Sequence, residues 1–301
     1  MPSLRPLAFG ELLDGAFTLY RRDFTTLFTT SLLAAIPLAL AGRMMEAAVI
    51  SEDSAAADPS AAGSMMAAVV LSALLWSLVW GALTRQTARQ LRDEETSVRD
   101  GYARSLRVLP RMAGAGLVIM LAGLVLLIAV ALVLALAALL LASMNMGDTA
   151  AGFVLAILSL VAFLVAVVVL ASFFAVIPAM VVEDLGVWAS LRRSDRLARG
   201  ARLRILGLVI VSSIIAILPL VGISFLVGIG GAMWDVESAA ALSPGQVVLQ
   251  QLVTVVCTAL TTPFMVGCFT LLYFDRRVRT EGYDIDLVAE ALDQPSEPAL
   301  S

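Results

Sequence analysis

Six long apolar runs constrain the fold of this 301-residue chain more than any other feature of its sequence. A helix of about 20 mostly apolar residues is long enough to cross the roughly 30 Å hydrocarbon core of a bilayer. Only 15% of the residues are charged, whereas soluble domains carry about 25%. We therefore predict an all-α fold class, a polytopic membrane protein with six transmembrane helices at approximately residues 24–50, 65–83, 112–142, 150–182, 205–233 and 247–274.

The basic residues predict how these helices are oriented. All 20 are arginines, and the sequence contains neither lysine nor histidine. They collect before the first run, between the second and third, between the fourth and fifth, and after the sixth, while Arg43 falls on the opposite side. Basic residues concentrate in the cytoplasmic loops of membrane proteins. We therefore predict a multi-pass protein of the plasma (cytoplasmic) membrane with both termini in the cytoplasm.

Three arginine-bearing stretches beside these runs carry their apolar residues on one helical face. They cover residues 9–27, 98–111 and 187–199. Apolar residues spaced three and four apart, with charged residues opposite them, are typical of an amphipathic helix at a membrane interface. We predict three cytoplasmic amphipathic helices lying in the plane of the membrane surface.

These stretches also suggest a threefold internal repeat of one in-plane helix plus a membrane hairpin. The pattern RSxR occurs at 104–107 and at 193–196, and GLVI occurs at 116–119 and at 207–210. The first copy shares little beyond an Asp-Gly pair, and chance similarity between arginine clusters and aliphatic runs remains an alternative. The three predicted units are residues 1–93, 94–184 and 185–282, and together they form one integral membrane domain. An acidic tail follows at 283–301, and we predict it to be disordered.

The sequence offers few groups that could carry out a reaction. Without histidine it has no histidine-based catalysis and no histidine-metal site, and Cys257 and Cys268 lack partners for a thiolate metal site. Glu183 and Asp184 are the best candidates for carboxylates that hold Mg²⁺, but adjacent residues at a helix end point in different directions. We expect a protein that is not an enzyme and that needs no cofactor; an intramembrane enzyme is the weakest alternative.

Three motifs resemble the membrane domain of bacterial glycerophosphoryl diester phosphodiesterases: FGELLDGAFTLYRRDFTTLF, VVEDLGVWASLRRSDRLARGARLRILG and PFMVGCFTLLYFDRRVRTEG. The likeness extends from about Leu4 to Asp286. In some members of that family this domain precedes a soluble catalytic domain, which uses histidines and a carboxylate-bound metal. Because this chain has no histidine, and because we expect no catalytic domain after Asp286, the resemblance implies a free-standing membrane domain without the enzymatic activity.

The arginine clusters of the second and third amphipathic stretches are the candidate binding residues. They form one face each: Arg104, Arg107 and Arg111, and Arg192, Arg196 and Arg199. Anchoring of the topology alone would account for them. The functional alternatives are binding of membrane lipids with anionic headgroups, where each arginine contributes about 1 kcal/mol, or docking of a membrane or cytoplasmic protein partner. We expect no nucleic-acid partner, because these arginines should lie against phosphate headgroups.

Two functions remain open at this stage. The first is a non-catalytic scaffold or a lipid- or partner-binding membrane module. The alternative is a transporter or channel for a small or lipid-like solute, which is favoured by the repeat, by prolines within the spans and by a polar stripe in the sixth run: Gln250, Thr254, Thr258, Thr261 and Thr262. No ionisable residue lies in the middle of runs two to six, which argues against a proton-coupled pump.

Overall fold

The computed structural model describes residues 7–50, 59–143, 148–234 and 244–282, so the tail 283–301 lies outside the described residues. Every regular element in these ranges is a helix, and six of the helical segments are long and apolar enough to cross a membrane, which confirms the all-α prediction and the six candidate spans. In chain order the elements are α1 (Phe9–Arg22), α2 (Phe24–Ile50), α4 (Pro59–Gln90), α5 (Val98–Ser143), α6 (Asp148–Leu170), η1 (Ala171–Phe173), α7 (Val176–Val182), α8 (Val187–Ala198), α9 (Arg202–Trp234) and α10 (Pro244–Glu281).

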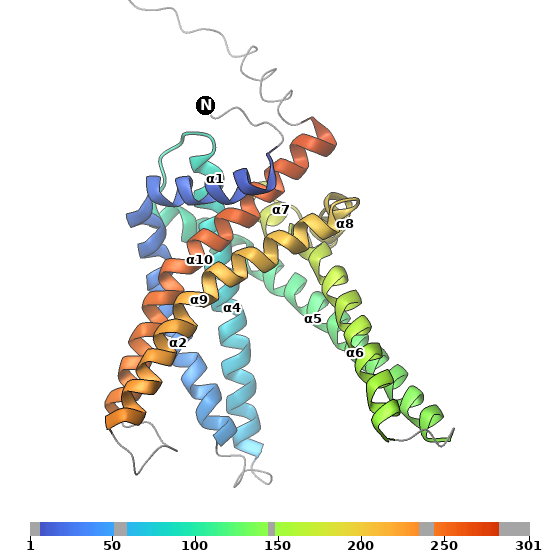
Figure 1. Cartoon of the computed structure of the whole chain (residues 1–301). Helices are drawn as coiled ribbons and strands as arrows, with labels where there is room; N and C mark the ends of the chain where they lie inside the picture. Colours follow the sequence, from blue (N-terminus) through green and yellow to red (C-terminus); the bar gives the residue numbers. More distant parts are fainter. Residues whose placement is uncertain (1–6, 51–58, 144–147, 235–243, 283–301) are drawn as a thin grey trace, which may run out of the picture.

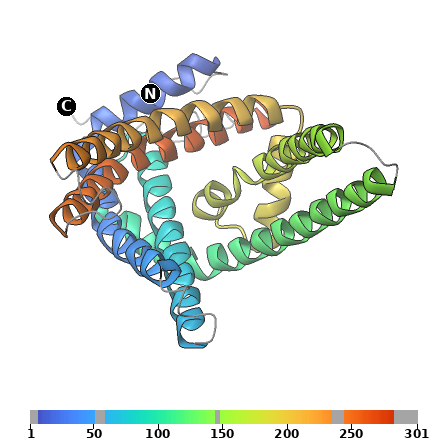
Figure 2. The same cartoon turned by 60° about the horizontal axis from the view of Figure 1, so that its bottom comes forward.

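Four of the spanning helices form a bundle from which the other two diverge (Figures 1 and 2). Helices α2, α4 and α10 contact one another, and α9 lies along α10. The hairpin of α5 and α6 points away from this bundle in both views. In the most apolar 18-residue stretch of α10, 44% of the residues are buried, whereas the share is 0% in α5 and in the span that contains α6. The hairpin is therefore held mainly at the end where α5 begins and α6 finishes.

Helix α5 corrects the prediction of a separate in-plane helix at residues 98–111. It is one continuous helix of 46 residues, Val98–Ser143. At 1.5 Å per residue it is about 69 Å long, more than twice the thickness of a bilayer core. Pro110 lies inside the helix although an interior proline costs about 3 kcal/mol. The neighbouring residues Val108 and Met112 are buried in a hydrophobic cluster, and this packing offsets the cost and keeps the helix unbroken.

The fourth apolar run corrects a second prediction, because it is not one helix. It is divided into α6, η1 and α7. Ser194 of α8 stabilises the division: its hydroxyl donates to the carbonyl of Ser172 at 2.6 Å and accepts from the backbone N–H of Ala175 at 3.0 Å. Pro178 lies in the first turn of α7, where the N–H that proline lacks would have no helical partner.

The hydrophobic core lies where α1, α8 and α10 meet. Five side chains from these helices are no more than 1% exposed and belong to one cluster: Leu12, Ala16, Leu197, Leu272 and Tyr273. Helix α1 lies across α10 (Figure 1). The core therefore sits at the end of the spans that carries most of the arginines, and it fixes the position of α8.

Four helix ends in the described ranges share a left-handed backbone conformation. Asp93 follows α4, Asp184 follows α7 and Gly282 follows α10, with φ angles of 56°, 57° and 67°, and Gly200 follows α8 with a φ angle of 75°. A left-handed residue just after a helix turns the chain so that the next N–H groups reach the last carbonyls of the helix. At the first of these ends, the N–H of Glu94 donates to the carbonyl of Arg89 at 3.1 Å. The turns at Asp93, Asp184 and Gly282 follow the last helix of a hairpin, whereas the turn at Gly200 connects α8 to α9.

Candidate functional site

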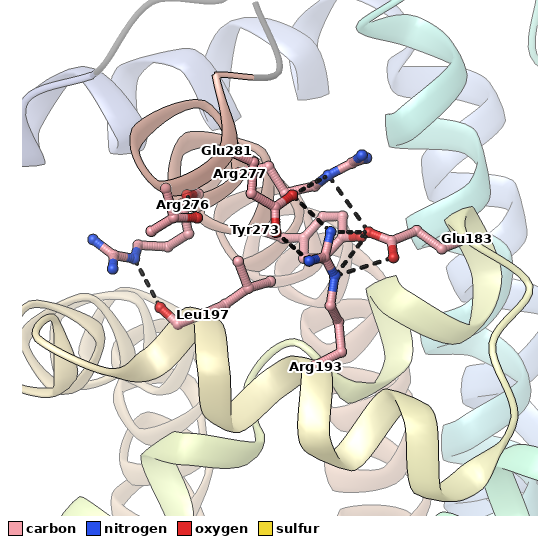
Figure 3. A network of polar contacts seen from close by, with 8 residues as sticks. Glu183, Arg193, Leu197, Tyr273, Arg276, Arg277 and Glu281 are labelled. Atoms are coloured by element: carbon pink, nitrogen blue, oxygen red, sulfur yellow. Dashed lines mark hydrogen bonds and ion pairs between the residues drawn. The ribbon is translucent and has the colours of Figure 1, made fainter. Parts of the chain in front are cut away.

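A cluster of charged side chains joins α7, α8 and α10 (Figure 3). The guanidinium of Arg193 donates to Glu183 at 2.9 Å and to Glu281 at 2.7 Å. The hydroxyl of Tyr273 also donates to Glu183, and the Nε of Arg277 lies 3.4 Å from the same carboxylate. The Arg193, Glu183 and Arg277 side chains are only 14%, 19% and 15% exposed. We call these five residues the α8–α10 cluster.

The positive and negative charges of the α8–α10 cluster balance one another. Burial disfavours the charged form of Arg193, but its hydrogen bonds to Glu281 and Glu183 outweigh burial and raise its pKa above the usual value for arginine. Two guanidiniums, of Arg193 and Arg277, therefore face two carboxylates. Because each charge is compensated inside the cluster, the arrangement holds α8 against α10 and leaves no excess charge to bind a ligand.

No sequence pattern predicts this role for Arg193, Tyr273, Arg277 or Glu281. The chain separation between the partners is large, 90 residues from Tyr273 to Glu183 and 88 from Arg193 to Glu281, so no local pattern links them. The one available signal was the RSxR pattern, because its first arginine is engaged by a carboxylate in both copies.

Three of the six candidate arginines are occupied by neighbouring acids. Arg104 and Arg111 both contact the same oxygen of Asp184, at 3.2 and 2.7 Å. Arg199 pairs with Asp195 at 2.7 Å, and its hydrogen bond lowers the pKa of that carboxyl. These pairs also occupy Asp184, one of the two acids that the sequence offered for Mg²⁺, while the α8–α10 cluster occupies Glu183. In the described ranges no group of three or more potential metal-ligating side chains comes together.

The other three candidates, Arg107, Arg192 and Arg196, are exposed. None of them forms an ion pair with the described part of the chain. Arg192 and Arg196 are held by a fixed helix, because Arg276 donates from α10 to the carbonyl of Leu197 at 2.8 Å. The structure thus divides the predicted set into paired arginines that fix the fold and exposed arginines that carry uncompensated charge.

A cavity of about 480 Å³ lies between α5, α6, η1, α8 and the start of α9. Arg192, Asp195 and Arg202 form its polar part, and most of the remaining wall is apolar: Val118, Ile119, Ala122, Val169, Phe173, Trp188 and Leu191. Ser172 also lines it, is 6% exposed, and has a hydroxyl oxygen without a hydrogen-bond partner in the described ranges. A second cavity of about 690 Å³ follows the loop between α8 and α9, from Arg199 to Arg204.

Three threonines of the polar stripe of α10 donate within their own helix. Thr254 donates to the carbonyl of Gln250, Thr261 to that of Cys257 and Thr262 to that of Thr258, at 2.9, 2.9 and 2.7 Å. Threonine commonly makes this bond to the residue four positions earlier in a helix. The two cysteines are buried and free. Neither feature adds a binding group to the cavity.

Comparisons with known proteins place this chain in a family without assigning a reaction. Neither the curated proteins nor the solved structures contain a match. One family model, described as a domain of unknown function (DUF7847), matches residues 24–275, from the first residue of α2 to the buried acid near the end of α10. The match covers all six candidate spans in large part, and the chain therefore belongs to the DUF7847 family.

Proposed function

We propose that this protein is a non-catalytic membrane module of the plasma membrane that binds anionic lipid headgroups through its cytoplasmic arginines. The observation that carries the proposal is the uncompensated charge of Arg107, Arg192 and Arg196, which are exposed beside spanning helices. Near an anionic leaflet each such arginine contributes about 1 kcal/mol of attraction. The occupied acids Glu183 and Asp184 favour this function over phosphoryl transfer, because a Mg²⁺ site would have to break their ion pairs.

The proposed orientation puts α1, α8 and the beginning of α5 at the cytoplasmic surface, with both termini on that side. Trp188 supports it, because its indole is 66% exposed on α8 and tryptophan is enriched at the membrane interface. On α8, Leu191 and Ser194 are buried while Arg192 and Arg196 are exposed. A helix lying in the surface plane needs this division between a buried face and a charged face.

We further infer that the chain is built from three copies of one unit. The left-handed residues Asp93, Asp184 and Gly282 coincide with the ends of the three predicted units. In each unit an arginine of the opening amphipathic stretch pairs with an acid at or next to the end of the unit: Arg22 with Asp93, Arg104 with Asp184, and Arg193 with Glu281. These recurring contacts support the repeat, and the likeness to phosphodiesterase membrane domains supports a role as a membrane module.

The experiment compares lipid retention by wild-type protein and by the triple variant R107Q/R192Q/R196Q. Both are purified from nanodiscs containing equal phosphatidylglycerol and phosphatidylcholine, and the retained lipids are counted by native mass spectrometry. Three arginines at about 1 kcal/mol each predict at least a roughly tenfold loss of preference for phosphatidylglycerol. The variant R107K/R192K/R196K keeps the charge and should keep most of the preference. Equal retention by wild type and the glutamine variant would exclude this function, and a soluble acidic protein lost from that variant would favour a docking role.

A transporter for a lipid-like solute is the second candidate. The divergence of the α5–α6 hairpin from the bundle favours it, since helices with 0% burial in their apolar stretch are free to move through lipid. Liposomes containing the protein and a fluorescent phospholipid would test it. Translocation faster than in protein-free liposomes would support transport, and identical rates would exclude it for that lipid.

A further inference from the structure

The cavity beneath α8 has two chemically different parts. Its polar part is formed by Arg192 of α8 and Arg202, the first residue of α9. Its apolar part is formed by side chains of α5, α6 and η1, including Ile119, Val169 and Phe173. A cavity with charge at one end and aliphatic and aromatic groups at the other matches an amphipathic ligand better than a small polar one.

The polar part carries a net positive charge. Arg202 lies 3.3 Å from Asp195, but Asp195 also binds Arg199 at a shorter distance of 2.7 Å. Arg192 has no ion pair with the described residues. Two guanidiniums therefore face the cavity beside one acid that is shared with a third guanidinium, and an anion is the complementary ligand.

Ser172 provides a second, independent indication of a ligand. It is 94% buried, since its exposed fraction is 6%, and it lines the cavity. Its backbone carbonyl accepts from Ser194, yet its own hydroxyl has no partner in the described ranges. A buried hydroxyl is normally hydrogen-bonded, and a rotation of the Ser172 side chain toward the cavity would let a ligand oxygen satisfy it.

The volume limits the size of what the cavity holds. At about 480 Å³ it lies within the usual range of ligand pockets, roughly 300–1,000 Å³. Trp188 lines the cavity, and tryptophan is enriched at the membrane–water interface. The apolar stretches of α5 and α6, which are not buried by protein, begin beside it. A headgroup and the adjoining part of one acyl chain fit this position, and the rest of the lipid would lie against the hairpin.

We propose that this cavity is a specific site for one anionic glycerophospholipid. The phosphate lies at Arg192 and Arg202, the hydroxyl of Ser172 donates to a headgroup or ester oxygen, and an acyl chain lies against Ile119, Val169 and Phe173. This proposal rests on the proposed function, because it assigns to the cavity a defined share of the anionic-lipid binding. It adds one saturable site to the diffuse attraction of the exposed arginines.

Tryptophan fluorescence tests the site, because Trp188 lies in its wall. Wild-type protein in phosphatidylcholine nanodiscs is titrated with phosphatidylglycerol brominated on its acyl chains, and the same titration of W188F isolates the Trp188 signal. We expect Trp188 to be quenched at a phosphatidylglycerol fraction at least tenfold lower than the fraction of brominated phosphatidylcholine that gives equal quenching. Equal quenching by the two lipids would overturn the proposal.

Two variants separate the site from the general charge effect. A122F fills the cavity without changing a charge, and A131F adds the same ring at an exposed position of α5 away from it. A122F should abolish selective quenching of Trp188 and remove one retained phosphatidylglycerol in native mass spectra, whereas A131F and R107Q/R196Q should keep both. If A122F behaves like A131F while R107Q/R192Q/R196Q still loses its lipid preference, the cavity site is wrong and the proposed function stands.

A soluble headgroup distinguishes a lipid site from a site for a free phosphate ester. Glycerol 3-phosphate is added to the nanodiscs at concentrations up to the millimolar range. Displacement of the brominated lipid only at the highest concentrations supports the lipid site, because the acyl chain contributes to binding. Displacement at micromolar concentrations would overturn it in favour of a free phosphate ester as the ligand.

Discussion

The α9–α10 hairpin and the α5–α6 hairpin are both apolar enough to cross a membrane, yet they are held in different ways. Helix α10 contributes Tyr273, Arg277 and Glu281 to the α8–α10 cluster, and 44% of its most apolar stretch is buried. The α5 and α6 spans have 0% burial in theirs. The more apolar hairpin is therefore the less buried one. Polar residues at the arginine-bearing end hold α10 against α8, because in lipid an aliphatic face gains little by leaving the hydrocarbon.

The largest loss of stability is expected when Arg193 is replaced, because this arginine holds α10 but not the α5–α6 hairpin. R193Q leaves the largely buried Glu183 and Glu281 with one guanidinium instead of two, that of Arg277 at 3.4 and 3.5 Å, and weakening a buried ion cluster in this way costs about 3 kcal/mol or more. Thermal unfolding of the purified protein in nanodiscs measures the loss. R196Q, a substitution of an exposed arginine on the same helix, is the control and should change stability by less than about 0.5 kcal/mol. Equal effects of the two variants would mean that the α8–α10 cluster does not hold α8.

A smaller effect is expected from truncating leucines in the two hairpins. Leu272 of α10 is 0% exposed and Leu132 of α5 is 65% exposed. L272A should cost about 2–5 kcal/mol because it leaves a cavity in the core. L132A should cost much less, because lipid fills the space that the side chain leaves. Comparable losses for both variants would show that the α5–α6 hairpin packs against protein, for example against a second copy of this chain.

The close contact between α4 and α5 gives the smallest of the three expected effects. A Cβ atom at Gly81 would clash with the hydroxyl oxygen of Ser105, which donates to the carbonyl of Leu78 at 2.7 Å. G81A should therefore cost about 1–3 kcal/mol through overpacking. The double variant G81A/S105A removes the clashing oxygen and should recover part of this loss. Additive losses in the double-mutant cycle would mean that the two residues are not in contact.

The six spans could be predicted from the sequence because transfer into hydrocarbon depends on local composition. The exposed positions of Arg192 and Arg196 could also be predicted, since a helical period assigns residues to faces. The division of the fourth run could not be, because it depends on Ser194, which is 22 residues away from the carbonyl that it binds. Sequence patterns likewise could not show which arginines are paired, since Arg192 and Arg193 are adjacent and only the fold brings Glu183 and Glu281 to the second.

The continuity of α5 illustrates the same limit. Pro110 and the change from charged to apolar residues both favoured a boundary near residue 111, and local propensity supports that interpretation. The buried side chains on either side of the proline belong to a cluster with α7 and α8, however, and this packing keeps the helix continuous. Tertiary packing therefore decides the outcome even against a strong local preference.

The most direct test of lipid binding is an experimental structure determined in a bilayer that contains phosphatidylglycerol. The account predicts one headgroup phosphate within hydrogen-bonding distance of Arg192 and Arg202, with Ser172 donating to the same lipid and the α8–α10 cluster intact. A cavity filled by protein side chains, or Arg192 paired with a carboxylate of its own chain, would contradict it.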